Sequence, residues 1–148
     1  MTYIVDTHIL IWYLDRNKKL RPLHLKILKD NGNKLVFSTI VLAEIKHLIS
    51  VKRIKVDFDK VTDYLSASEN CIIYPVDEEV IEEMPEGLNI HDALIVATGL
   101  VFKNRLKEEV RILTEDEDII KGLRVRSCFL TLSFLREITV GVNGDSTL

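Results

Sequence analysis

Short apolar runs alternate with amphipathic stretches along most of the chain. The runs have the length of buried strands, and they begin near Tyr3, Lys34, Cys71 and Glu109. Between them, apolar residues recur every three or four positions, which is the spacing of a helix with one buried face. Strands that alternate with helices predict a mostly parallel sheet joined by right-handed crossovers. The sequence therefore predicts an α/β fold with helices on both faces of the sheet.

The amphipathic stretches predict six helices, and polar residues mark several of their ends. The helices are expected over residues 9–14, 23–29, 40–49, 56–68, 77–81 and 93–102. Ser38 or Thr39 caps the third helix and Asp77 the fifth, because short polar side chains accept hydrogen bonds from the free amides of a first turn. The turn at residues 31–33 (Asn-Gly-Asn) ends the second helix.

The end of the chain carries a further strand and helix signal. Residues 124–129 (Arg-Val-Arg-Ser-Cys-Phe) are interpreted as a last strand. Thr131 or Ser133 is then expected to cap a short helix over residues 134–135.

One domain accounts for the length of the sequence. A chain of 148 residues is long enough for one sizeable core and too short for two comfortable domains. Its 47% hydrophobic and 29% charged residues are typical of globular proteins, and no proline-, glycine- or serine-rich linker interrupts it. We expect a single domain over residues 1–140 and a frayed tail over residues 141–148.

The apolar segments do not predict a membrane span or an export signal. The longest of them, residues 92–102, is shorter than the roughly 18 residues that cross a bilayer. No basic segment precedes an apolar one at the N-terminus, as it would in a signal peptide. Cys71 and Cys128 lie far apart and without a zinc-ligand spacing, so we expect two reduced core residues. These features predict a cytoplasmic protein.

The net charge of -3 argues against a protein that coats nucleic acid by bulk charge alone. Basic residues nevertheless gather in four groups, within residues 16–21, 46–55, 103–107 and 124–126. Each group taken alone is typical of a solvated helix face or helix end.

Four acidic residues stand beside apolar segments. They are Asp6, Glu44, Asp92 and Asp116. Each has a structural interpretation when it is taken alone. Asp6 can cap a helix, and Glu44 can pair with His47 or Lys52 at the border of a buried face. Asp92 can be a first-turn residue, and the last acid belongs to a run of four that can start a solvated helix.

The predicted fold brings these four acids to one place. Asp6 and Asp116 follow strands, and the carboxyl ends of parallel strands meet at one edge of a sheet. Glu44 and Asp92 lie near the starts of helices that enter from the same edge. The carboxylates would repel one another unless a cation were bound. Carboxylate oxygens without His or Cys favour magnesium or manganese.

Four segments carry a resemblance to a known family. They are Val5-Asp6-Thr7-His8 and residues 38–45, 91–98 and 113–119. In this order and spacing they resemble the PIN domain family, and specifically the single-domain toxin ribonucleases of the VapC type from toxin–antitoxin pairs. The resemblance covers residues 3 to about 135. It implies a three-layer PIN-like fold with a mostly parallel five-stranded sheet flanked by helices.

The resemblance also implies a metal-dependent endoribonuclease and its site residues. The residues that match the family's acids, which would bind Mg²⁺ or Mn²⁺, are Asp6, Glu44, Asp92 and Asp116. Asp118 is an alternative for the fourth acid, because the acid run leaves that assignment open. Ser38 and Thr114 match positions where the family keeps a small hydroxyl residue, and Thr7 is expected to support Asp6.

Roles and partners follow from the same resemblance. We hypothesise that Asp6 and Asp92 bind the metal directly, while Glu44 and Asp116 complete the shell or orient water. The residues that could guide an RNA backbone are Lys46, Lys52, Arg53, Lys103 and Arg105. A relative of this type usually forms a homodimer, and a small antitoxin whose tail enters the acidic groove neutralises it.

Two other classes of protein share parts of this pattern. Aspartyl-phosphate phosphohydrolases need Asp-x-Asp after the first strand, and here His8 occupies the second acidic position. A non-catalytic PIN-like module could bind RNA or a protein without cutting. The four acids oppose that alternative, because a module that only binds has no use for mutually repelling carboxylates.

Overall fold

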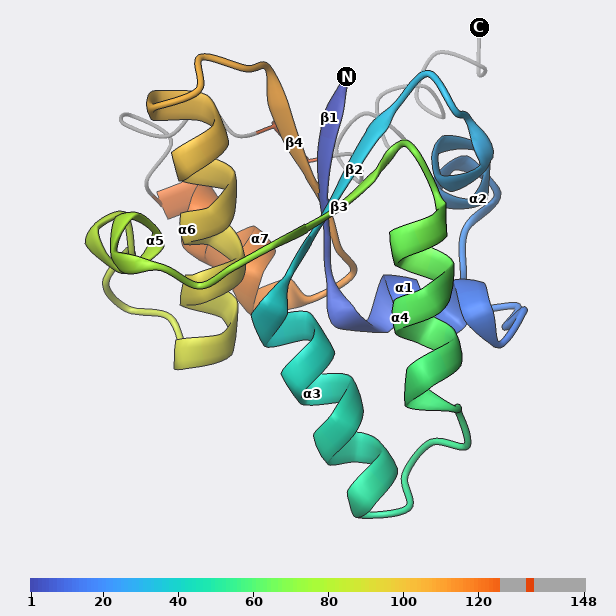
Figure 1. Cartoon of the computed structure of the whole chain (residues 1–148). Coiled ribbons are helices and arrows are strands. Elements are labelled where there is room, and N and C mark those ends of the chain that lie inside the picture. Colours follow the sequence, from blue (N-terminus) through green and yellow to red (C-terminus); the bar gives the residue numbers. More distant parts are fainter. Residues whose placement is uncertain (126–132, 135–148) are drawn as a thin grey trace, which may run out of the picture.

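The fold is built around a parallel sheet. The computed structural model of the chain describes the backbone of residues 1–125 and 133–134 and the side chains of residues 1–121. The strands are β1 (Thr2–Val5), β2 (Lys34–Ser38), β3 (Cys71–Tyr74), β4 (Val110–Leu113) and the two-residue β5 (Ser133–Phe134). They pair in the order β3-β2-β1-β4-β5, and every pair is parallel (Figure 1). The predicted α/β fold with a parallel sheet is confirmed.

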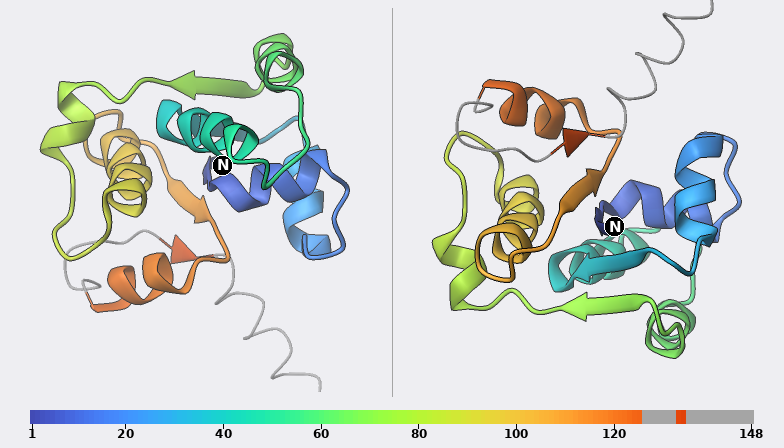
Figure 2. Two further views of the ribbon diagram at one scale, coloured as in Figure 1. Left: turned by 90° about the horizontal axis from the view of Figure 1, so that it is seen from below. Right: turned by 90° about the horizontal axis from the view of Figure 1, so that it is seen from above.

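Helices form the two outer layers. They are α1 (Thr7–Leu14), α2 (Pro22–Lys29), α3 (Thr39–Ser50), α4 (Phe58–Ala67), α5 (Glu78–Glu82), α6 (Ile90–Asn104) and α7 (Glu117–Val125). Helices α5, α6 and α7 lie on one side of the sheet, and α1, α2 and α4 lie on the other (Figures 1 and 2). Helix α3 leaves the carboxyl end of β2 and extends beyond the sheet (Figure 1).

The core covers both faces of the central strands, with α6 on one face and α1, α2 and α4 on the other. Ile4, Val36 and Ile112, on three adjacent strands, have no exposed surface. Residues 92–102 of α6 are all buried, which explains why this helix is apolar on every side. At Gly99 an added Cβ would lie 3.4 Å from Cγ1 of Ile4, so α6 packs close to β1. This packing fixes the start of α6 at the carboxyl edge of the sheet.

The six predicted helices all form, and their ends differ from the expected ones by a few residues. The predicted caps at Ser38 and Asp77 are also confirmed. The hydroxyl of Ser38 accepts a hydrogen bond from the Ile40 amide, and the Asp77 carboxylate accepts one from the Val80 amide. The spacing of apolar residues and the capping residues therefore predicted the positions of these six helices.

The prediction for the last elements was wrong where the structure describes them. Residues 124 and 125 end helix α7 instead of starting a strand, and Ser133 and Phe134 form β5 instead of a final helix. A short alternation of polar and apolar residues fits the last turn of an amphipathic helix as well as a strand. Residues 126–132 and 135–148, including Cys128, Thr131 and the predicted tail, lie outside the described part of the chain.

Helix α1 ends in a tight turn. The amides of Arg16 and Asn17 donate to the carbonyls of Tyr13 and Trp12, and Arg16 has a left-handed φ of 51°. Glycine is the residue usually found at this position of the turn. The positive charge of Arg16 near the helix C-terminus offsets part of the backbone strain.

Candidate metal centre

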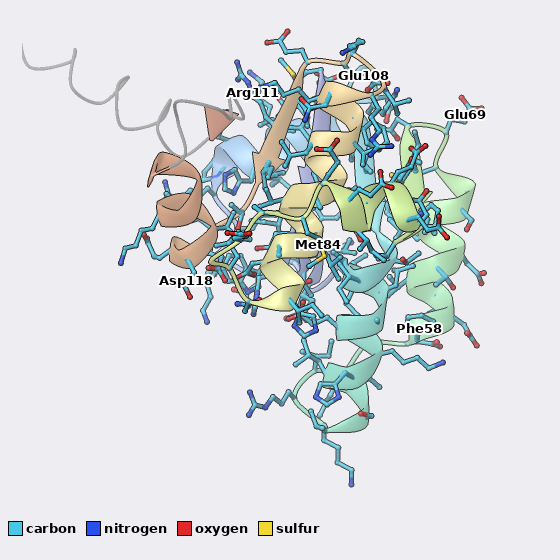
Figure 3. All side chains as sticks on the ribbon, turned by 90° about the vertical axis from the view of Figure 1, so that its left-hand side faces the viewer. Phe58, Glu69, Met84, Glu108, Arg111 and Asp118 are labelled. Atoms are coloured by element: carbon cyan, nitrogen blue, oxygen red, sulfur yellow. The ribbon has the colours of Figure 1, made fainter. Side chains whose placement is uncertain are left out.

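The acidic residues gather at the carboxyl edge of the sheet, which is the lower edge of the sheet in Figure 1. Asp6 follows β1, and Asp116 lies three residues after the end of β4. Asp92 lies in the first turn of α6. Asp118, labelled in Figure 3, lies far from Glu108, which precedes β4 at the opposite edge. The ends of the strands and the starts of the helices therefore place acids that are far apart in the sequence at one edge of the sheet.

Asp6 is held by groups from two strand ends. Its Oδ1 accepts a hydrogen bond from the Thr7 amide at 2.7 Å, and its Oδ2 accepts one from the Thr114 hydroxyl at 2.6 Å. Thr114 Oγ1 in turn accepts from the amide of Asp116 at 2.9 Å. Asp6 is only 5% exposed, and this burial raises its pKa despite the two hydrogen bonds. The structural interpretation of Asp6 as a helix cap is confirmed, and the same carboxylate also anchors the loop after β4.

Three other carboxylates form a cluster. One oxygen each of Asp92, Asp116 and Asp118 lies within 4.8 Å of the other two. Asp92 is buried, Asp116 is half-buried and Asp118 is exposed. Oδ1 of Asp116 also accepts the amides of Asp118 and Ile119, which fixes its orientation at the start of α7. The alternative acid Asp118 therefore lies in the cluster together with Asp116.

Among the side chains of residues 1–121, the cluster has acidic neighbours and no cationic partner. Burial is the main reason why the pKa of Asp92 is raised to about 6, and the carboxylates of Asp116, Asp6 and Asp118 raise it further. A hydrogen bond of 2.6 Å from the Asn89 side chain to Oδ2 of Asp92 acts in the opposite direction. Close carboxylates of this kind are stable together when a cation neutralises them.

Glu44 is linked to the centre through one residue. Its Oε2 accepts a hydrogen bond of 2.7 Å from the Thr7 hydroxyl, and the amide of Thr7 binds Asp6. Glu44 is not a member of the cluster of three acids. Its partner is thus Thr7 on α1 and not His47 or Lys52, the two partners expected for a purely structural role. Thr7 connects the two acids, as a supporting residue would.

Ser38 and Thr114 differ in what their hydroxyls contact. Thr114 reaches Asp6 directly, as described above. The fully buried hydroxyl of Ser38 binds the start of α3 through the Ile40 amide. Ser38 therefore positions the helix that carries Glu44, and Thr114 positions the acids themselves.

The basic residues selected from the sequence are scattered. Lys46, Lys52 and Arg53 are exposed on or just beyond α3, and the Lys46 ammonium lies 5.1 Å from the centre of the Phe58 ring. Lys103 and Arg105 lie at the other end of α6 from Asp92, roughly 20 Å away along the helix axis. The structure does not bring this last pair to the acidic rim.

Arg105 already has acidic partners. Its guanidinium contacts Glu79, Glu82 and Glu83 at 3.7, 2.6 and 3.4 Å. These contacts join the end of α6 to α5 and its C-terminal cap. Sequence reasoning could not separate this structural cation from a free one, because the partners lie more than twenty positions away in the chain.

Two supports of the site were missed in the sequence. Asn89 caps α6, and its side chain exchanges hydrogen bonds with the backbone and carboxylate of Asp92. The spacing of Asn89 and Asp92 is that of a capping box, a signal that could have identified the pair. Arg21 Nε lies 2.7 Å from Oε1 of Glu115, next to Asp116, and no local pattern indicates this long-range contact.

His24 adjoins the same contact. It is fully buried, and its Nδ1 lies 3.6 Å from Oε1 of Glu115. Burial, helped by the Arg21 charge, lowers the pKa of His24 to about 4, so the ring is neutral at pH 7. Together, Arg21 and His24 pack α2 against the loop that carries Asp116.

The residues fit a divalent metal ion. The cluster offers only carboxylate oxygens, and Asp6, bound to the same loop, adds another. Hard oxygen ligands of this kind suit Mg²⁺ or Mn²⁺ better than the softer ions that prefer His or Cys. An ion would also remove the repulsion that raises the pKa of Asp92. The arrangement can therefore hold a metal and bring it to a negatively charged substrate.

Comparison with protein families shows what this architecture is. In the part of the chain that the structure describes, no helix is both long and apolar enough to cross a membrane. A search of curated proteins gives no match for the chain. The PIN domain family model matches residues 3–122, about four-fifths of the sequence. This range contains every strand-end and helix-start acid described above. The chain belongs to the PIN domain family, whose members are generally metal-dependent nucleases.

Proposed function

We propose that this protein is a metal-dependent endoribonuclease that hydrolyses RNA with Mg²⁺ or Mn²⁺. The observation that carries the proposal is the cluster of Asp92, Asp116 and Asp118 within 4.8 Å, joined to Asp6 through Thr114. Membership of the PIN family supports nuclease chemistry and RNA as the nucleic acid.

The acids have different parts in this proposal. Asp6, Asp92 and Asp116 hold the metal, and Asp118 is the alternative to Asp116. The bound ion would lower the pKa of a water molecule and neutralise charge on the scissile phosphate. Thr7 and Thr114 fix the two oxygens of Asp6, so that this carboxylate cannot rotate. Glu44, half-buried and held by the Thr7 hydroxyl, orients the attacking water.

The reaction is an in-line displacement at phosphorus. The water oxygen forms the new P–O bond and loses a proton, while the P–O3′ bond breaks and the 3′-oxygen gains a proton. The products are a 5′-phosphate and a 3′-hydroxyl. These ends distinguish the reaction from metal-independent cleavage, in which the 2′-hydroxyl attacks and leaves a cyclic phosphate.

We also infer that the protein is the toxin of a toxin–antitoxin pair. The sequence resembles VapC-type toxins over its motifs, so we infer a homodimer in the cytoplasm that a small antitoxin inhibits by entering the acidic rim. A short neighbouring gene for a DNA-binding protein, whose product co-purifies with this chain and blocks cleavage, is the expected finding. A chain that is encoded alone and is harmless when overexpressed, while still cleaving RNA, would remove the toxin role and leave the nuclease.

A non-catalytic binding module is the second candidate. It would explain the fold, but it gives no reason why three other carboxylates lie close enough to Asp92 to raise its pKa. A phosphohydrolase is less well supported, because the exposed His8 stands where that class needs its second acid, and its ring lies 6.0 Å from that of Trp12.

The test is cleavage of a fluorophore–quencher RNA and of total cellular RNA. The protein is first stripped of metal with EDTA, and Mg²⁺ or Mn²⁺ is then added. We expect metal-dependent cleavage by the wild type and by the control Asp63→Asn, an exposed acid on α4. The double variant Asp6→Asn/Asp92→Asn should be inactive. Cleavage by the double variant at the wild-type rate would refute the assignment, and a wild type that binds RNA without cutting would favour the binding module.

A further inference from the structure

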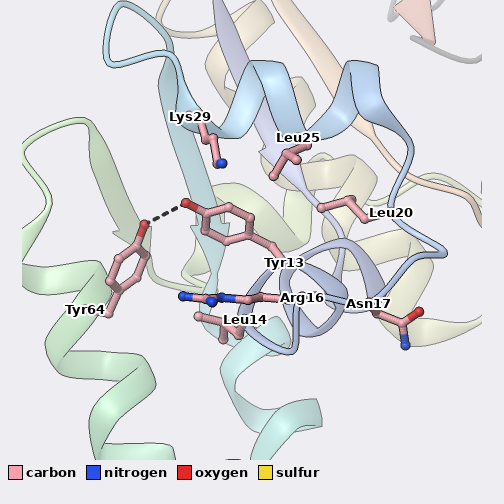
Figure 4. A pocket seen from close by; sticks show the side chains of 8 residues that line it. All are labelled: Tyr13, Leu14, Arg16, Asn17, Leu20, Leu25, Lys29 and Tyr64. Carbon is pink, nitrogen blue, oxygen red and sulfur yellow. Dashed lines mark hydrogen bonds between the residues drawn. The ribbon is translucent and has the colours of Figure 1, made fainter.

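A hollow of about 650 Å³ opens on the side of the molecule away from α6 (Figure 4). It is lined by the end of α1, the loop that follows, helix α2 and Tyr64 of α4. The side chains of Leu20 and Leu25 form an apolar wall of the hollow. Tyr13 and Tyr64 add two aromatic rings. Sites for small organic ligands usually have volumes of about 300 to 1,000 Å³ and mostly apolar walls with a few polar groups.

The two tyrosines form a bridge at one side of this hollow. Their hydroxyls lie 3.2 Å apart, and their ring centres are 6.4 Å apart with the planes tilted by 52° (Figure 4). A second hollow of about 530 Å³ shares Tyr13, Lys29 and Tyr64, so the bridge stands between the two. Tyr64 is 43% exposed, which leaves ring surface available for contact. A hollow bounded on one side by such a bridge suits one planar group better than a row of side chains from a helix.

The same region is strongly basic in an acidic protein. Residues 16–29 contain six Lys or Arg and no Asp or Glu, whereas the whole chain has a net charge of -3. Arg16 and Lys29 line the hollow, and among the described side chains no carboxylate does. Five of these six cations are exposed, and they have no ion-pair partner within residues 1–121. The exception is Arg21, which binds Glu115.

We propose that this hollow binds one unpaired nucleotide of an RNA strand, with the base against Tyr13 and Tyr64 and a phosphate on Arg16 and Lys29. Unpaired RNA bases stack on aromatic side chains and on Arg planes, and phosphates pair with Arg and Lys. The rings, the exposed cations and the apolar wall of the hollow supply all three contacts. Only the identification of that strand as the substrate rests on the proposed function.

Helix α1 connects the hollow to the acidic rim. Thr7, beside Asp6, and Tyr13, in the hollow, are six residues apart, a rise of roughly 9 Å along the helix. The basic segment also contacts the loop of the acids, because Arg21 binds Glu115. A nucleotide in the hollow would thus lie a short distance along the strand from the bond that is cut. The hollow is therefore a candidate for selecting which unpaired RNA is cleaved.

The first test uses uridine 5′-monophosphate and adenosine 5′-monophosphate as probes of the full-length protein in EDTA. Backbone amide NMR shifts are expected around Tyr13, Arg16, Lys29 and Tyr64, and inorganic phosphate should shift them much less. Shifts confined to the acidic rim, equal shifts with phosphate alone, or no shifts would each overturn the nucleotide site. Shifts produced by an acidic peptide but not by the nucleotides would assign the hollow to a protein partner instead. This test does not depend on whether the protein cuts RNA.

The second test compares two charge-matched double variants. Arg16→Gln/Lys29→Gln alters the hollow, and Lys55→Gln/Lys107→Gln removes two exposed cations outside it. For single-stranded RNA we expect KM to rise about tenfold in the first variant relative to the second, with kcat unchanged, because one stacked and paired nucleotide is lost. Tyr64→Leu should give a similar increase. Equal KM values in the two double variants would refute the site while leaving metal-dependent cleavage intact, and absence of any cleavage would instead refute the nuclease proposal.

Discussion

Acidic side chains lie at both edges of the sheet. Glu108 at one edge contacts a lysine, whereas Asp92 at the other edge lies near other carboxylates. At the amino edge, Glu108 accepts hydrogen bonds from Lys34 and Thr2 at 2.6 and 2.7 Å. Partial burial works against its charge, but these contacts bring the pKa of Glu108 below its usual value. At the carboxyl edge, Asp92 faces three other carboxylates and has a pKa of about 6. Within residues 1–121, Glu108 thus has a cationic partner, whereas Asp92 has acidic neighbours that a bound cation would neutralise.

Removal of acids at the carboxyl edge should have the largest effect. We expect Asp92→Asn alone to lower the rate of metal-dependent RNA cleavage by at least about a hundredfold, since a misplaced or missing metal removes charge stabilisation worth several kcal/mol. Initial rates on the fluorophore–quencher RNA measure this loss. Glu108→Gln is the matched change at the amino edge and should retain the wild-type rate. A similar loss in both variants would mean that the two edges do not differ in function.

Metal ions should stabilise the protein only through the carboxyl edge. With Mn²⁺ at about 100 times its Kd, the free energy of unfolding should rise by about 2.7 kcal/mol, because the ion binds the folded state alone. Thermal unfolding with Mn²⁺ and with EDTA measures the change as a shift in Tm. Asp92→Asn should show little of this shift, and Glu108→Gln should show all of it. A shift in Asp92→Asn as large as that of the wild type would place the ion elsewhere.

The two edges should also respond to pH with opposite signs in metal-free protein. The pKa of Asp92 is raised in the folded state, so its ionisation destabilises the fold as pH rises from about 4 through about 6. The pKa of Glu108 is lowered, so its contribution is present at neutral pH and is lost as pH falls through the folded pKa. Asp92→Asn should therefore raise the Tm at pH 7.5 by a few degrees. It should have no such effect on the Tm at pH 4. An equal effect at both pH values would contradict repulsion between Asp92 and the neighbouring carboxylates.

The ion pair of the amino edge should contribute only modestly. Lys34→Met keeps the length of the side chain but removes the charge beside Glu108, and we expect a loss of about 0.5 to 1 kcal/mol because the pair is partly exposed. Urea unfolding measures it. Cleavage activity should not change, and a large loss of activity would connect this edge to the site after all.

The smallest expected effect concerns the basic hollow. Arg16→Gly relieves a left-handed φ of 51°, and we expect a gain of about 0.5 kcal/mol in the free energy of unfolding, reduced by the loss of the cation at the helix end. Urea unfolding measures the gain, and the same variant should bind single-stranded RNA more weakly. Unchanged RNA binding would show that Arg16 is not part of the nucleotide site.

The sequence predicted the fold and most positions of the acids because both depend on local signals. Alternating strands and helices determine a parallel sheet, and the sheet in turn determines which edge receives Asp6, Asp92 and Asp116. Contacts between distant segments were not accessible in this way. Examples are the Arg21–Glu115 pair and the glutamates that contact Arg105, a residue predicted to guide RNA.

Local ambiguity explains what the sequence left open and where its prediction was wrong. Within the acid run, residues 116 and 118 are two positions apart, and only the geometry of the first turn of α7 brings both carboxylates beside Asp92. The end of α7 was predicted as a strand because a few alternating residues carry no decisive period. Tyr13 and Tyr64 are 51 positions apart, so no local pattern predicts the hollow that they share.

Titration of Mn²⁺ into metal-free protein by isothermal calorimetry tests most directly whether the uncompensated acids form a metal centre. At pH 7.5 we expect saturable binding by the wild type and by Glu108→Gln, and at least tenfold weaker binding by Asp92→Asn. Binding of equal affinity by the wild type and by Asp92→Asn would contradict the metal centre at the carboxyl edge.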